Sequence, residues 1–225
     1  MRVLITGTGT AVGKTWVACA LIRALRDVGK QVIAVKPVET GRSGQPSDWE
    51  DGVRLAKATR QEQPTQAIIR LPLPGAPVLG GEGVESSIDF DALVLKIEGY
   101  IDRAEFGLVE GTGGLLTPVT WEWNMTDLAR ELGAGALVVA EDRLGTINHT
   151  LLTLSALELA GIPCAGVVLT TPEATDRSTG ANAAAVARLS GVDRVMALPR
   201  AADPDDAAGS MVQVVGWLGR VAAPA

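Results

Sequence analysis

The sequence contains few cysteine and histidine residues. Its two cysteines, Cys19 and Cys164, lie far apart and show no C-x-x-C or zinc-ligand spacing. We therefore expect no disulfide and predict that both thiols fill the core of a protein in a reducing compartment. The one histidine, His149, leaves no Ser-His-Asp or Cys-His set, so hydrolases that depend on such sets are excluded.

Long apolar runs and basic clusters are also missing. No stretch of 18 uninterrupted apolar residues occurs, so we expect no membrane-spanning segment. Lysine and arginine do not cluster and the net charge is −6, which excludes an electrostatic surface for nucleic acid. The N-terminus runs directly into a predicted strand, so no signal peptide is expected. The predicted location is the cytoplasm.

Short apolar runs alternate with amphipathic stretches along the chain. Helices are predicted over 17–28, near 51–60, near 89–103 and over 151–160, and the rest of the Gly- and Pro-rich block 42–92 is predicted to be loop. Continuous β-branched runs predict strands buried on both faces, hence a parallel sheet. These strands are 2–6, 31–36, 106–110, 135–140, 165–170 and 194–198. We expect one three-layer, doubly wound α/β domain over 1–225.

The first strand runs into a glycine-rich loop in "VLITGTGTAVGKTW", residues 3–16. Gly13-Lys14-Thr15 fits the end of a phosphate-binding loop, although the loop is one residue longer than the usual G-x-x-x-x-G-K-S/T pattern. Its backbone N–H groups would bind phosphates, Lys14 would reach the outer phosphates and Thr15 would bind Mg²⁺. The fold is therefore predicted to be P-loop NTPase-like, with a nucleoside triphosphate as ligand.

Further polar residues follow the other predicted strands. Lys36 ends the second strand and would supply a fixed cation, with Thr40 in the turn beyond it. Glu110 ends another strand and is a candidate magnesium ligand beside Thr15. A third ligand could come from the acidic group at 48–51, and residue types alone do not choose among its members. All these positions meet at the carboxyl edge of the sheet, where α/β folds bind ligands.

Several motifs together resemble the dethiobiotin synthetase family. They are "TGTGTAVGKT", "VKPVETG", "LVEGTGGLLTP", "LGTINHTLLTLSAL" and "AGVVL", which occur in the family's order between residue 2 and roughly residue 206. The resemblance implies an ATP-dependent ligase of biotin biosynthesis. It would close a cyclic urea from diaminopelargonic acid and CO₂ or bicarbonate, through a carbamate and a carbamic-phosphoric anhydride. The family pattern also falls on "DGVRL" and favours Asp51 over Asp48.

The resemblance implies roles for particular residues. Lys14 and Lys36 would be catalytic, and Thr15, Asp51 and Glu110 would bind magnesium. The diamine substrate would contact Thr8, Lys36, Thr40, Gly145, Thr146, Ile147 and Asn148, with its carboxylate on the backbone of 145–148. A homodimer with the site at its interface is also implied. Nucleotide contacts are expected from Gly9, Thr10, Ala11, Val12, Gly13, Lys14, Thr15, Trp16, Asp51, Glu110, Gly111, Thr112, Gly113, Thr170, Thr171, Pro199, Arg200, Ala201 and Asp205.

The chain departs from the family pattern near the base and the carboxylate. Thr170-Thr171 stands where many relatives carry an Asn-Asp pair that reads adenine, so we predict relaxed base choice and use of other nucleoside triphosphates. Asn182 stands where some relatives carry a tyrosine for the carboxylate, and Ala11 replaces an acidic residue. In the shortened loop "GAPVLGGEG" the family's usual histidine is Val78.

Three other functions are considered. A partitioning ATPase of the same superfamily would carry a lysine early in the loop, where this chain has Thr6, Thr8 and Thr10. An amide ligase of the cobyrinic-acid type would need a glutaminase domain, for which 225 residues leave no room. A paralogue that binds nucleotide without catalysis is disfavoured by the intact lysine and carboxylate set.

Overall fold

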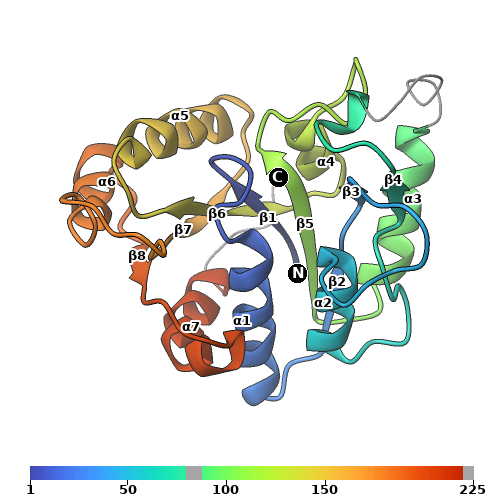
Figure 1. The fold of residues 1–225 in the computed structure, drawn as a ribbon, viewed down its shortest axis with the longest axis horizontal. Coiled ribbons are helices and arrows are strands. Elements are labelled where there is room, and N and C mark those ends of the chain that lie inside the picture. Colours follow the sequence, from blue (N-terminus) through green and yellow to red (C-terminus); the bar gives the residue numbers. More distant parts are fainter. Residues whose placement is uncertain (80–87, 220–225) are drawn as a thin grey trace.

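The computed structural model describes residues 1–79 and 88–219, and within them six parallel strands form the central sheet. The strand order β2-β5-β1-β6-β7-β8 is that of a doubly wound fold (Figure 1). All six predicted strands are confirmed. Their bounds are β1 Arg2–Gly7, β2 Val32–Val35, β5 Phe106–Gly114, β6 Gly135–Glu141, β7 Cys164–Thr170 and β8 Val195–Leu198.

Helices cover both faces of the sheet, which makes the three predicted layers. On one face lie α1 (Lys14–Asp27), α2 (Asp51–Thr59) and α7 (Pro204–Leu218). The other face carries α3 (Phe90–Ile101), α4 (Met125–Glu131), α5 (Thr146–Leu159) and α6 (Asn182–Ser190). The helices predicted over 17–28, 51–60, 89–103 and 151–160 correspond to α1, α2, α3 and α5.

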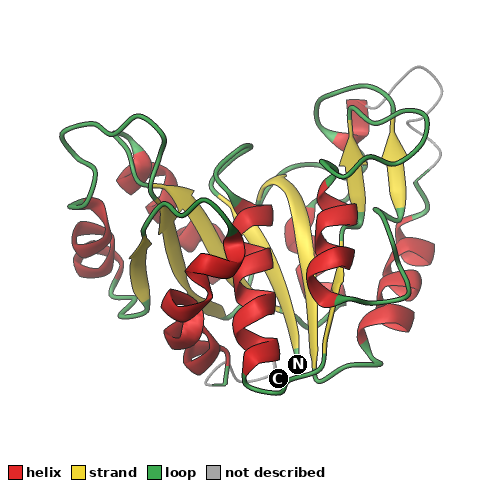
Figure 2. Ribbon diagram, turned by 60° about the horizontal axis from the view of Figure 1, so that its bottom comes forward, coloured by secondary structure: helices red, strands yellow, loops and turns green. Residues whose placement is uncertain are grey.

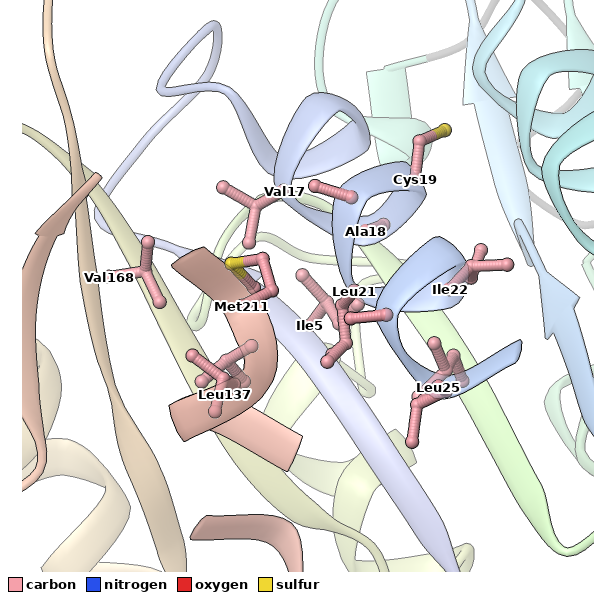
Figure 3. Packing of buried hydrophobic residues seen from close by; sticks show 14 of the residues in the cluster. Ile5, Val17, Ala18, Cys19, Leu21, Ile22, Leu25, Leu137, Val168 and Met211 are labelled. Atoms are coloured by element: carbon pink, nitrogen blue, oxygen red, sulfur yellow. The ribbon is translucent and has the colours of Figure 1, made fainter. Parts of the chain in front are cut away.

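Successive side chains along each strand point to opposite faces of the sheet, so the core is divided into two layers. In β1, Val3 and Ile5 pack toward α1 and α7, whereas Leu4 packs toward the opposite layer. Figure 3 shows Ile5 between Leu21 and Leu25 of α1 and Met211 of α7. All these side chains are fully buried, so the sheet is apolar on both sides.

A second, two-stranded sheet was not predicted. β3 (Val38–Thr40) pairs in parallel with β4 (Ile69–Leu71) (Figure 2). β3 replaces the turn predicted after Lys36, and β4 lies inside the block 42–92 that was predicted to be loop outside its helix. A single turn of 3-10 helix, Pro77–Leu79, follows, and Val78 is buried there. The second half of the loop "GAPVLGGEG" lies outside the described residues. Lys36 and Pro37 separate the end of β2 from the start of β3, and the chain then leads on to α2.

Three helices lie where we made no prediction: α4, α6 and α7. In α7, Asp203 caps the N-terminus by accepting a hydrogen bond from the N–H of Asp205, and Pro204 occupies the first turn. The predicted end of a strand at Glu110 is wrong, because β5 continues through Gly114. Within the described residues no helix reaches the length and apolarity that a bilayer crossing requires.

Candidate functional site

The phosphate-binding loop joins the end of β1 to the start of α1. Gly13 immediately precedes α1 with φ of +90°, a left-handed conformation that favours glycine, and Ala11 has φ of +59°. No side chain caps α1, so its first N–H groups are left for a ligand. A Cβ on Gly13 would lie 3.0 Å from Cγ2 of Thr170, which shows how closely the loop packs on β7. This geometry suits an anion at the helix N-terminus.

Lys14 is folded back over the loop. Its Nζ donates a hydrogen bond of 2.8 Å to the carbonyl oxygen of Gly9, and its side chain is buried. Burial, together with the nearby positive charge of Lys36, lowers the pKa of Lys14 to about 8. A phosphate in the loop would supply the negative charge that this ammonium lacks.

Lys36 lies at the centre of a buried ionic group. Its Nζ is 2.7 Å from Oε1 of Glu110 and 2.9 Å from Oδ2 of Asp51. It also donates to the carbonyl of Gly111, and the hydroxyl of Thr15 donates to Glu110 Oε1 over 2.8 Å. Lys36, just after β2, thus meets residues of α1, α2 and β5 at one point. The ammonium of Lys36 thus joins Asp51 to Glu110, and Thr15 joins this group through Glu110.

This group carries more negative than positive charge. Burial opposes the charge on Lys36, but Glu110 and Asp51 outweigh it and raise the pKa of the lysine. Burial likewise opposes ionisation of Asp51, yet attraction to Lys36 holds its pKa below the usual value. Burial raises the pKa of Glu110, and the carboxylate of Asp51 adds to that increase. One ammonium therefore serves two carboxylates.

One carboxylate oxygen of the group is left over. Oε2 of Glu110 is buried and has no hydrogen-bond partner within the described residues. An unpaired oxygen in that position is costly, and a hard cation is the partner it fits best. The donor set of one hydroxyl and two carboxylates therefore fits Mg²⁺ beside the phosphate loop, and Asp51 is the member of the acidic group 48–51 that lies in this set. Asp48 instead pairs with Lys57 on the surface.

These residues surround a cavity of about 360 Å³, which we call the phosphate cavity. It includes Glu39, Arg42 and Arg54, which were not predicted as site residues. Glu39 lies inside the motif "VKPVETG", so its place between Lys36 and Thr40 could have indicated a site residue. The lining residues are Thr10, Ala11, Gly13, Lys14, Thr15, Trp16, Lys36, Glu39, Thr40, Arg42, Asp51, Arg54, Glu110, Thr112 and Gly113.

A second cavity of about 420 Å³, the base cavity, opens on the other side of the loop. Trp16 and Gly13 line both cavities, so a ligand could extend from one to the other. Glu141 and Glu173 also line it and were not predicted. The lining residues are Ala11, Val12, Gly13, Trp16, Glu141, Thr170, Thr171, Pro172, Glu173, Leu198, Pro199, Arg200, Ala201 and Ala202.

The two threonines of the base cavity use their hydroxyl hydrogens elsewhere. Thr170 Oγ1 lies 3.0 Å from the carbonyl oxygen of Val12 and 3.2 Å from that of Ala140. Thr171 donates to the carbonyl of Leu198 over 3.0 Å. A hydroxyl has one hydrogen and two lone pairs, so toward the cavity both threonines are left as acceptors.

Several predicted residues do not line these two cavities, namely Thr8, Gly9, Gly111, the segment 145–148, Asn182 and Asp205. Asp205 pairs with Arg23 of α1 at 2.9 Å and does not line the base cavity. Asn182 is buried, and its amide donates to Oδ1 of Asp142 over 2.7 Å. The second carboxylate oxygen of Asp142 accepts the N–H of Gly180, so Asn182 ties the loop before α6 to the loop before α5.

The start of α5 borders a third cavity of about 510 Å³. Gly145 precedes this helix with φ of +91°, and no side chain caps the helix. Asn148 is exposed there, so the N-terminus of α5 is open to an anion. The cavity is lined by Thr8, Gly9, Thr10, Gly114, Leu115, Leu116, Thr117, Pro118, His149, Leu152, Thr153 and Ala156.

Comparison with known proteins identifies the family. The chain is 44% identical over 202 residues to the ATP-dependent dethiobiotin synthetase BioD of Anaeromyxobacter dehalogenans strain 2CP-C, covering 87% of this chain and 88% of that protein. The chain belongs to the dethiobiotin synthetase family. The protein of the same name from Mycobacterium tuberculosis strain H37Ra is 36% identical over 208 residues, covering 91% and 87% of the two chains. A family model described as an AAA domain matches residues 1–208.

Solved structures agree on the fold. The cell division ATPase MinD of Pyrococcus furiosus superposes with a TM-score of 0.55 at 19% identity, covering 98% of this chain and 99% of that one. A MinD complexed with Mg-ADP from Pyrococcus horikoshii gives the same TM-score at 18% identity, covering 98% and 90%. At these identities the likeness shows the P-loop NTPase-like fold alone, which a dethiobiotin synthetase shares with such ATPases.

Proposed function

We propose that this chain is an ATP-dependent ligase that closes a cyclic urea from diaminopelargonic acid and CO₂, releasing ADP and phosphate. Its family membership supports the reaction. The observation that carries it within the site is the buried ammonium of Lys36, 2.7 Å from Glu110 and beside the phosphate loop. A reaction in which every intermediate is an anion requires a fixed cation at that place.

In the proposed reaction, one amine of the substrate takes up CO₂ and loses a proton to become a carbamate. A carbamate oxygen attacks the γ-phosphorus of ATP, and ADP leaves with the electrons of the broken P–O bond. The second amine then attacks the carbonyl carbon, the ring closes and phosphate leaves. Lys14 would hold the transferred phosphoryl group, and Lys36 would orient the carbamate against it.

Magnesium is part of the proposal. Thr15, Asp51 and Glu110 would hold it, and the unpaired Oε2 of Glu110 is the observation that favours this set. A bound Mg²⁺ would supply positive charge to the phosphate oxygens. The residues of the chain contribute position, because the two carboxylates are already held by Lys36 and by the hydroxyl of Thr15.

We also propose that the substrate carboxylate binds the open N-terminus of α5, at Gly145, Thr146, Ile147 and Asn148. A homodimer with its site at the interface is proposed as well. Leu152 and Leu159, one heptad apart on α5, are exposed, as is Leu144 before the helix. Leu152 also lines the cavity beside α5, and exposed leucines along one helix fit a contact with a second copy of the chain.

The nucleotide base is proposed to lie in the base cavity, against Pro199, Arg200 and Ala201. The acceptor character of Thr170 and Thr171 supports use of more than one base. Two acceptors favour a base whose exocyclic amino group can donate a hydrogen bond to them, as those of ATP and CTP can.

The experiment that tests this function is phosphate release from Mg-ATP by the purified chain, with and without diaminopelargonic acid plus bicarbonate. Mass spectrometry of the same mixture detects the cyclic urea. Release that depends on the diamine and is accompanied by product supports the ligase. Release at the same rate without the diamine, and no product, would overturn it in favour of an ATPase.

A further inference from the structure

Helix α2 carries Asp51 in its first turn, but its own N-cap residue does not cap it. That residue is Glu50, whose carboxylate accepts hydrogen bonds from Arg70 and from the N–H of Ser47. The first N–H groups of an α-helix have no partner within the helix and need an acceptor from elsewhere. The acceptor here comes from a different element.

The acceptor is Glu39 of β3. Its Oε1 accepts the N–H of Asp51 over 2.8 Å, and its Oε2 accepts the N–H of Gly52 over 3.0 Å. Glu39 is 3% exposed, and Arg42 balances its charge at 2.9 Å. A buried carboxylate at a helix N-terminus is also favoured by the helix dipole. Glu39 therefore caps α2 across elements, with both of its oxygens.

A second contact also fixes this turn. A Cβ on Gly52 would lie 2.2 Å from the backbone nitrogen of Ala67, so the helix start rests directly on that backbone. The position of Asp51 thus depends on the cap by Glu39 and on the packing at Gly52. Lys36 and Glu39 belong to one short segment that contacts Asp51 twice, at its carboxylate and at its N–H.

We propose that Glu39 is a positioning residue for Asp51, and through it for the divalent cation of the site. The inference rests on the proposed magnesium role of Asp51. Glu39 lines the phosphate cavity but bonds to backbone N–H groups and to Arg42, so it acts by holding the first turn of α2. Losing a residue that orients a metal ligand typically weakens metal affinity about 10- to 100-fold.

The test compares Glu39→Ala and Glu39→Gln with a matched control, Glu50→Gln, in the full chain. Glu50 is as buried as Glu39, lies beside the same helix start and also holds an arginine. It accepts neither the N–H of Asp51 nor that of Gly52. Both Glu39→Gln and Glu50→Gln therefore remove a buried carboxylate next to α2, but only Glu39→Gln weakens the cap of that helix.

The direct measurement is Mn²⁺ binding by electron paramagnetic resonance, with a non-hydrolysable ATP analogue present. We expect Glu39→Ala to weaken Mn²⁺ binding at least about 10-fold, and Glu39→Gln, which keeps one acceptor oxygen, to weaken it less. Glu50→Gln is expected to lower the thermal midpoint and leave Mn²⁺ affinity unchanged. Kinetics should agree, with the Mg²⁺ concentration for half-maximal rate raised only in the Glu39 variants.

Two results would overturn the proposal: unchanged Mn²⁺ affinity in Glu39→Ala, or equal weakening in Glu50→Gln. If Glu39→Ala does not fold, Glu39→Gln against Glu50→Gln decides the question alone. Product formation by the unmodified chain is measured separately. If the unmodified chain makes no cyclic urea but Mn²⁺ affinity still falls in the Glu39 variants, the proposed reaction is wrong and the role of Glu39 is supported.

Discussion

The site has two regions that are built very differently. In the phosphate region, Lys36 and Glu110 are 3% and 1% exposed, and each polar group is held by others of the same chain. In the outer region, at the ends of β6, β7 and β8, the side chains of Arg200 and Glu173 are 57% and 88% exposed and lie 3.8 Å apart. The polar groups of the phosphate region are therefore preorganised without a ligand, whereas the outer region, where we propose that the base binds, offers exposed and less constrained side chains.

The largest effect is expected from Lys36→Met, which removes the cation of the phosphate region. Asp51 and Glu110 would then face each other without a counter-charge, so we expect turnover to fall about 10²- to 10³-fold. The thermal midpoint should also fall, because a buried ionic group loses one partner. Initial rates of product formation and a thermal melt measure the two effects.

Lys57→Met is the control for that variant, because Lys57 is an exposed lysine on the neighbouring α2 and pairs with Asp48 at the surface. It should keep full activity. If Lys36→Met retained activity within about threefold of the control, a difference of less than 1 kcal/mol, the two regions would not differ as described.

The next effect concerns the proposed dimer. Leu152→Glu places a charge on the exposed face of α5, and in a two-fold interface it would meet a second copy of itself or apolar side chains. Like charges or unpaired charges in an interface cost several kcal/mol, so the dimer dissociation constant should rise about 100-fold or more. Sedimentation velocity measures this.

Leu95→Glu is the matched control, since Leu95 is an equally exposed leucine on α3. It should leave assembly unchanged. A Leu152→Glu protein that sediments as the unmodified chain does would remove α5 from the proposed interface, and would make the outer region complete within one chain.

A smaller effect is expected for the base. With Thr170 and Thr171 acting as acceptors, ATP and CTP should be used with lower KM than ITP and UTP, by about tenfold for one hydrogen bond. Steady-state kinetics with the four nucleotides test this. Thr171→Val removes one acceptor and should bring the KM for ITP closer to the KM for ATP. Equal KM for ATP and ITP in the unmodified chain would contradict the acceptor reading of the base cavity.

The smallest effect on activity is expected from Asn182→Ala. Its amide contacts Asp142 and Ser178, so its loss should lower the free energy of unfolding by about 1–3 kcal/mol and leave the KM for the diamine unchanged. Asn148→Pro, which removes a backbone N–H from the open end of α5, should instead raise the KM for the diamine. Urea unfolding and diamine kinetics on both variants measure the contrast. A raised KM in Asn182→Ala alone would return Asn182 to the substrate site.

Most of the sheet and the phosphate region could be predicted from the sequence. Buried parallel strands leave continuous apolar runs, and the phosphate loop places Lys14 and Thr15 by local pattern alone. The strands β3 and β4 were missed because three residues with a charge at the centre, such as Glu39, carry no periodicity. Helix α7 was missed although Asp203 and Pro204 are an N-terminal signal.

The contacts of the outer region could not be predicted for a different reason. Nothing in the neighbourhood of Asn182 or Asp205 indicates that their partners are Asp142 and Arg23, which lie 40 and 182 positions away in the chain. The role of Glu39 could not be predicted for the same reason. A helix cap supplied by another element leaves no pattern in the sequence at the start of α2. Long-range polar pairing is decided by the fold.

The packing of Gly13 against Thr170 has a consequence for how such an enzyme could diverge. Thr170 faces the base cavity, yet its hydroxyl lies within hydrogen-bond distance of the carbonyl of Val12 and its methyl group meets the loop at Gly13. A larger amide at that position would press on the phosphate loop. A substitution at residue 170 that changed base preference would therefore also change the shape of the phosphate loop. An evolving lineage would have to adjust the base cavity and the loop together.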